Sequence, residues 1–223
     1  MNDKRKMILT YIMLMFLLPV VLTIGLQVLS ANDIIPSISK SKTIMYANMT
    51  VYLFLPVAAI MILHKRLSSD LKKTGGLLLK IIPLILIVYA SSMLGNLFVG
   101  LLDHTQTTDN QTLINELRNT NSLFTAYMAA FAAPIAEESV FRYSIIADRK
   151  GFSGFFTLIL SSALFGLIHT QGFTLGAFLA YAVIGFTLGC IYLKYRNLVF
   201  NILVHAGYNG SALLLSYLMS QYS

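Results

Sequence analysis

Charged residues are scarce in this sequence of 223 residues. Lys, Arg, Asp and Glu make up 11% of the chain, whereas the apolar set AVILMFWYC makes up 57%. Roughly a quarter of an ordinary soluble domain is charged, so the composition excludes that class and predicts a membrane protein. At about 20 apolar residues per span, the chain can supply about six or seven transmembrane helices. No large water-soluble domain remains.

Cysteine is also nearly absent, because Cys190 is the single one in the sequence. One thiol cannot close an intramolecular disulfide or supply a thiolate metal cluster, which excludes disulfide scaffolds and zinc ribbons. No charged neighbour in the sequence would activate the thiol. We therefore expect Cys190 to fill space between helices.

Apolar runs separated by polar segments predict an all-α, polytopic transmembrane helical bundle of about seven spans. The polar segment 103–120 reads as an outer loop with room for a short helix. No linker divides the chain, so we expect one integral-membrane domain in which 1–120 holds the first three helices and the outer loop, and 121–223 forms the catalytic core. The apolar runs lie at about 7–30, 43–64, 77–102, 121–147, 153–169, 173–193 and 198–220.

The positive charge is distributed unevenly along the chain. With a cytoplasmic N-terminus, twelve Lys and Arg residues fall on inner segments, whereas Lys40, Lys42 and Arg118 fall on outer ones. This positive-inside bias predicts an N-terminus in the cytoplasm and, with seven spans, a C-terminus outside. The positive-inside bias therefore explains the net charge of +7. We expect the lipid bilayer as a partner and no nucleic acid. Nothing in the pattern sets an oligomeric state.

The run 121–147 carries three charges well inside an apolar stretch, at Glu137, Glu138 and Arg142. Three central charges would cost about 8–10 kcal/mol against lipid, and the apolar residues of the run return only about 2–4 kcal/mol. This helix should therefore pack among its neighbours. Glu138 and Arg142 are four residues apart and can form an ion pair on one helix face. Glu137 has no such partner and is free for chemistry, beside a predicted kink at Pro134.

Two later helices bring histidines to membrane depth. Phe165 and His169 are four residues apart, as are His205 and Asn209, so each pair shares a helix face. A lone intramembrane histidine is most often a packing residue, but two of them with two glutamates indicate a functional site. Such a glutamate and histidine could take a proton from water, while a second histidine and an asparagine donate to an oxyanion. Glu137, His169 and His205 could instead hold a zinc ion that activates water.

Other protease designs fit less well. The sequence has no HExxH motif, and its aspartates lie outside the apolar runs, which excludes the common zinc and aspartyl designs. The segment 151–154 is similar to the GxSG of rhomboid proteases and could pair Ser153 with His205. That serine alternative leaves the two glutamates unexplained. A proton-coupled transporter is a further alternative, although the spans show no evident inverted repeat.

Three motifs occur in order on successive apolar segments. Residues 137–142 read EESVFR, 165–169 read FGLIH and 205–209 read HAGYN. They resemble the EExxxR, FxxxH and HxxxN motifs of the CAAX protease and bacteriocin-processing (CPBP, or Abi) family of intramembrane endopeptidases. The resemblance is carried by 137–209 alone, because the first three spans are similar to the family only in hydropathy.

The resemblance implies a role for each motif residue. Glu137 and His169 would activate water, and His205 and Asn209 would bind the oxyanion. Glu138, Arg142 and Phe165 would support the site. We favour a glutamate mechanism without a metal cofactor and keep zinc as the alternative.

The resemblance also implies a substrate class. The small size and short loops are typical of a prokaryotic plasma-membrane protein, for which a membrane-associated peptide or protein, such as a bacteriocin leader, is the expected substrate. The competing function is a catalytically silent immunity or signalling scaffold.

One expectation conflicts with a simple bundle. At about 1.5 Å per residue from the inner edge, Glu137 would be about 15 Å deep, His205 about 10 Å and His169 about 24 Å. The helix that ends at His169 must therefore be tilted or its ends displaced along the bundle.

Overall fold

The protein is described by a computed structural model that covers residues 2–35, 40–105, 107–170 and 172–220. Across these residues the regular structure is helical and contains no strand, so the predicted all-α bundle is confirmed. The helices in chain order are α1 (Asp3–Ile12), η1 (Met13–Leu17), α2 (Leu18–Ala31), α3 (Lys40–Thr74), η2 (Gly75–Lys80), α4 (Ile81–Phe98), η3 (Val99–Asp103), α5 (Asp109–Thr120), α6 (Ser122–Tyr127), η4 (Met128–Ala132), α7 (Ala133–Glu137), η5 (Glu138–Ile146), α8 (Gly151–Ile168), α9 (Leu175–Tyr195) and α10 (Leu198–Ser220).

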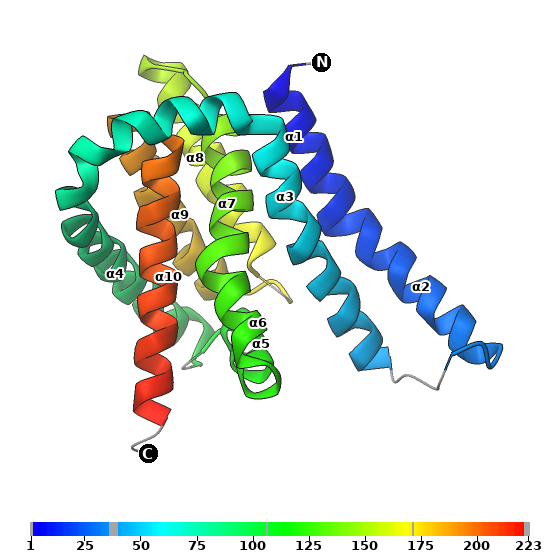
Figure 1. The fold of residues 1–223 in the computed structure, drawn as a ribbon. Helices are drawn as coiled ribbons and strands as arrows, with labels where there is room; N and C mark the ends of the chain where they lie inside the picture. The colour runs from blue at the N-terminus through cyan, green and yellow to red at the C-terminus, as the bar shows by residue number, and fades with distance from the viewer. Residues whose placement is uncertain (1, 36–39, 106, 171, 221–223) are drawn as a thin grey trace.

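The predicted spans correspond to these helices. Five helical stretches are long and apolar enough to cross a membrane, and one of them, Met49–Asp103, has 55 residues. At about 20 residues per crossing this stretch is long enough to cross twice. Figure 1 shows it rising as α3, running across one end of the bundle and descending as α4. The charged segment 121–147 is helical as well, and the two chain ends lie at opposite ends of the bundle, which fits an odd number of crossings.

The four segments predicted to share the inner face meet at one end of the bundle. Lys4 donates to Asp148 at 2.9 Å, which joins α1 to the connection between η5 and α8. Arg66 donates to the carbonyl of Arg196 at 2.7 Å, and Arg196 in turn donates to the carbonyls of Ala147 and Arg149. The guanidinium groups therefore satisfy carbonyls that helix ends leave without partners. On the outer side, the side chains of Lys40 and Lys42 are outside the described part of the chain.

Helices α8 and α9 approach closely because glycines face the neighbouring helix. A Cβ atom on Gly166 would lie 2.7 Å from the carbonyl oxygen of Phe178, and one on Gly185 would lie 3.1 Å from the Cβ of Phe165. Small residues at such positions are a main device for close helix contact in membranes. Gly166 and Gly185 therefore allow α8 and α9 to pack at short range.

The charged helix occupies the centre of the bundle. Every residue from 132 to 142 is buried, and in Figure 1 α7 stands between α3 and α10. The prediction that this helix packs among neighbours is therefore confirmed. Cys190 differs from its prediction, because its side chain is exposed on α9 and does not fill a space between helices.

Candidate active site

The backbone around the two glutamates departs from a regular α-helix. Glu137 ends α7 and Glu138 begins η5, a π-helical segment of nine residues, and a second π-helical turn, η4, precedes α7. An i→i+5 helix turns less per residue than an α-helix, and such turns are frequent at functional sites. Neighbouring side chains are therefore closer to a common face than the 100° spacing of an α-helix allows. Both carboxylates can thus approach one histidine of α10.

Glu138 is fully buried, with 0% of its surface exposed. Its Oε1 accepts from Nδ1 of His205 at 2.9 Å, and its Oε2 accepts from Nδ2 of Asn201 at 2.5 Å. Nε of Arg142 lies 3.3 Å from the same Oε2, so the predicted ion pair with Arg142 is confirmed. Burial of a carboxylate is tolerated only with such partners. Glu138 therefore holds the bundle together and orients the imidazole of His205.

Arg142 is buried completely as well. Its guanidinium lies over the ring of Phe165 at 4.8 Å from the centroid, an attractive cation–π arrangement. It also donates to the carbonyl of Gly185 at 3.3 Å. The resemblance implies a supporting role for Phe165, and its ring contacts both the guanidinium of Arg142 and the ring of His169.

Glu137 faces both predicted histidines. Its Oε1 lies 3.6 Å from Nε2 of His169, and its Oε2 lies 3.9 Å from Nε2 of His205. Three helices therefore bring together three side chains that are far apart in sequence. Only 6% of the surface of Glu137 is exposed. A carboxylate flanked by two ring nitrogens in a nearly dry place is suited to exchange a proton with a small molecule held among them.

The partners of the two rings determine which nitrogen faces the glutamate. Nδ1 of His169 lies 2.8 Å from the carbonyl oxygen of Phe165, and since a carbonyl only accepts, this nitrogen carries a hydrogen. Nδ1 of His205 carries a hydrogen as well, because its partner is the carboxylate of Glu138, which also only accepts. Both Nε2 atoms are thereby directed toward Glu137, each free to accept or donate.

The depth conflict at His169 is resolved by the placement of α8. In Figure 1 this helix begins above the upper ends of its neighbours and ends near mid-height, well short of the lower end of α10. His169 is the residue that follows its last turn. The structure brings Nε2 of His169 within 3.6 Å of Oε1 of Glu137, so the two residues share one depth in the bundle.

Asn209 was expected to donate a hydrogen bond to the oxyanion of the substrate, and in the structure it makes a hydrogen bond within the protein. Its Nδ2 donates to the carbonyl of Ala129 at 3.0 Å. In the π-helical turn η4 the N–H of Ala133 donates to the carbonyl of Met128, so the next bond in that pattern would join Ala129 to Pro134. Proline has no N–H, and Asn209 supplies the missing donor. One hydrogen of its amide remains for another acceptor.

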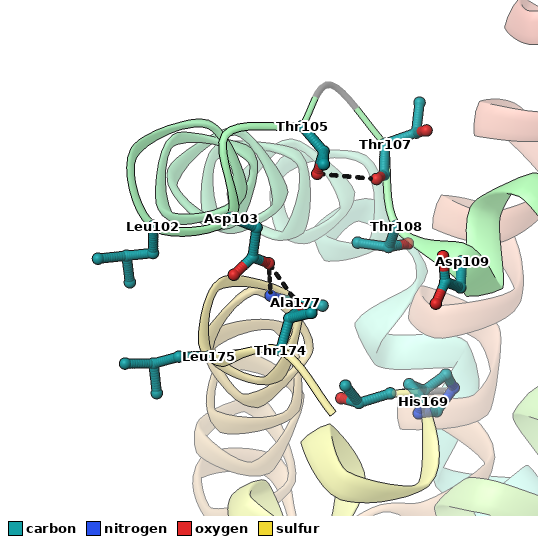
Figure 2. Close-up of a pocket in the computed structure, with 11 residues that line it drawn as sticks. Leu102, Asp103, Thr105, Thr107, Thr108, Asp109, His169, Thr174, Leu175 and Ala177 are labelled. Atoms are coloured by element: carbon teal, nitrogen blue, oxygen red, sulfur yellow. Dashed lines mark hydrogen bonds between the residues drawn. The ribbon is translucent and has the colours of Figure 1, made fainter. Parts of the chain in front are cut away.

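The four predicted catalytic residues line one cavity of about 1060 Å³. Other walls come from η1, α3, α4, α5 and α9, with α5 on the side opposite the basic end of the bundle. A smaller pocket of about 360 Å³ adjoins it and is drawn in Figure 2. The smaller pocket is rich in threonine and contains Asp103 and His169. His169, Thr107 and Thr108 line both spaces, so they form the boundary between them.

The serine alternative is not supported by the arrangement. Ser153 is exposed near the start of α8, beside the basic end of the bundle. It is not among the described residues that line the cavity with His205. Ser153 and His205 are therefore not brought together as a nucleophile and its base.

Two residues of the site were missed by sequence reasoning. Asn201 supports Glu138, and its position four residues before His205 on α10 was a usable signal. Tyr181 stacks on His169 with ring centroids 4.9 Å apart. No spacing rule indicated Tyr181, because it comes from a different helix and belongs to no motif.

Comparisons with known proteins agree with the motifs. Residues 119–211 match the family described as type II CAAX prenyl endopeptidase Rce1-like. The matched region contains all three motifs, and it confirms the resemblance to the CPBP family that they indicate. It corresponds to the region that carries every predicted catalytic residue.

A curated relative gives a second match. The chain is 30% identical over 141 residues to UPF0177 protein YvdC of Lactococcus lactis subsp. lactis (strain IL1403), an alignment that covers 62% of this chain and 52% of the relative. The chain thus spans about half the length of that protein. No solved structure gives a significant match.

Proposed function

We propose that this protein is an intramembrane endopeptidase that hydrolyses a peptide bond with a water molecule activated by Glu137. The observation that carries the proposal is the convergence of Glu137, His169 and His205 from three helices at the wall of one cavity. The match to a family of endopeptidases supports it. Burying two carboxylates costs free energy that a purely structural bundle has no need to bear.

In the proposed reaction Glu137 takes a proton from water while the water oxygen bonds to the carbonyl carbon of the substrate. The carbonyl oxygen becomes an oxyanion, which accepts hydrogen bonds from the remaining N–H of Asn209 and from Nε2 of His205. Because Nδ1 of His205 donates to Glu138, the imidazole carries a hydrogen on both nitrogens in this step. Collapse of this intermediate breaks the C–N bond, and the proton on Glu137 passes to the leaving amine. The products are a carboxylic acid and an amine, and Glu137 returns to its starting state.

His169 orients the attacking water in this scheme. Its Nε2 is 3.6 Å from Glu137 Oε1, longer than the usual 2.7–3.2 Å of a direct hydrogen bond. A water molecule off this line can donate to Glu137 and to Nε2 together. The contact of Nδ1 with the Phe165 carbonyl keeps Nε2 in the accepting tautomer while the water loses its proton.

We propose that the reaction needs no metal. Zinc requires ligand atoms at about 2.0–2.2 Å in a tetrahedral arrangement. Among the described residues, no group of three or more His, Cys, Asp or Glu side chains is placed to hold a metal ion. If zinc binds, Glu137, His169 and His205 are the donors that would have to converge on it.

The expected substrate is a membrane-associated peptide or protein. The cavity combines apolar side chains such as Met15 and Met128 with the polar start of α5, which suits a peptide at the membrane surface. We place the protein in the plasma membrane with its N-terminus in the cytoplasm, because the basic residues collect at one end of the bundle. The wall that α5 contributes to the cavity then lies on the outer side.

A silent immunity or signalling scaffold is the competing function. The two functions differ in whether they need the carboxylate of Glu137. An endopeptidase needs it as a proton acceptor, whereas a scaffold needs only the folded bundle. The test replaces Glu137 by Gln, which keeps the volume and removes the base. Asp33→Asn is the matched control, since Asp33 is an exposed acid in the turn after α2.

Cells that lack the native gene would express the wild type, Glu137→Gln or Asp33→Asn at equal levels. Mass spectrometry of membrane peptides should reveal species that accumulate uncut with Glu137→Gln and are cut by the other two. Each such peptide, made synthetically, should be cleaved by the purified wild type. Full biological activity of Glu137→Gln, with no uncut peptide, would favour the scaffold.

A further inference from the structure

The ring of His169 is enclosed by two aromatic side chains. Phe165 stacks on it with centroids 4.3 Å apart and an interplanar angle of 29°. Tyr181 of α9 stacks at 4.9 Å and 22°. Two rings cannot stack on one face of an imidazole, so they occupy opposite faces. Phe165 belongs to a recognised motif, whereas Tyr181 does not.

The hydroxyl of Tyr181 is attached to the first turn of α5. It lies 2.9 Å from Oγ1 of Thr108 and accepts from Nδ2 of Asn110 at 3.1 Å. Thr108 is the N-cap of α5 and accepts from the N–H of Gln111. The tyrosine hydroxyl thus has a donor and an acceptor partner, which fixes its position. Its ring is held at one edge by α5 and at one face by His169.

The contact lies at the boundary of the two cavities. Thr108 and His169 line both, and Figure 2 shows them on facing sides of the smaller pocket. Helix α5 also contributes Gln111, Ile114 and Leu117 to the wall of the larger cavity. A peptide entering that cavity from the side of α5 would contact this helix before it reaches Glu137.

We infer that Tyr181 is a positioning residue that fixes the ring plane of His169 and makes it depend on the placement of α5. The inference rests on the proposed function, because His169 must be the residue that orients water. Hydrolysis is sensitive to such positioning, since a displacement of about 1 Å can reduce a rate about 100-fold. Helix α5 then acts on catalysis through Tyr181 without contacting the reacting atoms.

Three variants distinguish the effect of the Tyr181 ring on His169, the effect of its hydroxyl bonds to α5, and the effect of losing any buried tyrosine hydroxyl. Tyr181→Leu removes the stacked ring, and Tyr181→Phe keeps the ring and removes the tether to α5. Tyr192→Phe is the matched control on the same helix, because the hydroxyl of Tyr192 is buried and has no hydrogen-bond partner among the described residues. We expect kcat to fall about 10- to 100-fold in Tyr181→Leu and less in Tyr181→Phe. KM should change little, and Tyr192→Phe should equal the wild type.

A second measurement does not depend on peptidase activity. The chain has 4 histidines, so ring-¹³C-histidine labelling in lipid nanodiscs gives a small set of NMR signals, and His169→Asn assigns that of His169. Loss of a stacked ring changes the ring-current shift of its neighbour. Tyr181→Leu should move the His169 signal and leave that of His64 in place. The smaller change in Tyr181→Phe should also appear in Asn110→Ala and should not add in the double variant.

The two measurements identify which idea fails. An unmoved His169 signal in Tyr181→Leu would overturn the positioning inference, whatever the activity. A moved signal with unchanged kcat would also overturn it, because the ring plane would then not matter for the reaction. If no peptide is cut even by the wild type, the proposed function fails, while the NMR result still reports on the contact itself.

Discussion

Nδ1 of His205 donates to Oε1 of Glu138 over 2.9 Å. This bond gives Glu138 a third partner besides Arg142 and Asn201 and directs Nε2 of the imidazole toward Glu137. Glu138 is therefore both a member of an ion pair and the residue that orients the ring expected to bind the oxyanion. Its replacement should affect folding and reaction together.

Glu138→Ala should lower both stability and activity. It leaves Arg142 buried without a counter-charge, and breaking a buried pair in this way costs about 3–5 kcal/mol. Because the chain contains no Trp, melting is best followed by circular dichroism. Glu138→Gln, which keeps the volume and an acceptor for His205, should melt above Glu138→Ala. A Glu138→Ala protein that is as stable as the wild type but inactive would assign Glu138 a direct part in the chemistry.

Asn201→Leu should destabilise the bundle by about 1–3 kcal/mol, because it leaves a buried carboxylate oxygen without its donor. Asn201 also donates to the carbonyl of Leu188 at 3.2 Å. Asn32→Ala is the control, since Asn32 donates to a backbone carbonyl from an exposed position, and it should change stability by less than about 0.5 kcal/mol. Denaturation in detergent measures both. Equal effects of the two variants would show that the contact with Glu138 adds nothing.

Stripping of metal ions should leave the activity intact. The mechanism uses the carboxylate of Glu137 as the base, and no described trio of donors is placed for a metal ion. Purified protein treated with a strong chelator should cleave its peptide at the untreated rate. Elemental analysis should find less than about one transition metal per chain. Loss of activity on chelation and recovery on adding zinc would require Glu137, His169 and His205 to act as ligands.

The ion pair of Lys4 and Asp148 should make a small, pH-dependent contribution to stability. The hydrogen bond from Lys4 lowers the pKa of Asp148, which lies outside the spans and has a side chain 66% exposed. A lowered folded-state pKa contributes stability above the unfolded value near 3.9, and this is lost as pH falls through the folded value. Exposure limits it to about 0.2–1 kcal/mol.

Melting of the wild type and Lys4→Met at several pH values tests this. The wild type should be slightly more stable near pH 7, and the two proteins should become equal below about pH 3. High salt should reduce the difference at neutral pH, because the pair is open to solvent. If the stability difference between the wild type and Lys4→Met grew as the pH fell, protonation of Asp148 would not be its cause.

Patterns within single helices were the most predictable part of this protein. Apolar runs gave seven helical segments, and the i, i+4 spacing of Glu138 and Arg142 gave an ion pair that the structure contains. These predictions succeed because they depend on the period of one helix and on the cost of charge in lipid. The approach of His169 and His205 to Glu137 was expected because all three are polar groups within apolar runs, although the depth estimate placed His169 too far along its helix.

Contacts between helices were harder to predict. The stack of Tyr181 on His169 depends on how α8 and α9 cross, and periodicity within one helix does not contain that information. The π-helical segments η4 and η5 were also missed, since the sequence showed a kink at Pro134 and not a change in hydrogen-bond pattern. Asn209 was predicted from its face alone, so its bond to the carbonyl of Ala129 was not foreseen.

The early end of α8 at His169 also has a consequence for the lipid around the protein. Beyond this end, Thr170, Thr174 and Asp109 of the first turn of α5 line the smaller pocket. At about 1.5 Å per residue the 18 residues of α8 span about 27 Å, against about 30 Å for a typical hydrocarbon core, so we expect a smaller hydrophobic thickness on this side. Lipids with longer acyl chains would bring hydrocarbon toward that lining and create a hydrophobic mismatch there. Bilayer thickness thus becomes a variable that acts on the environment of His169 without contact with a catalytic residue.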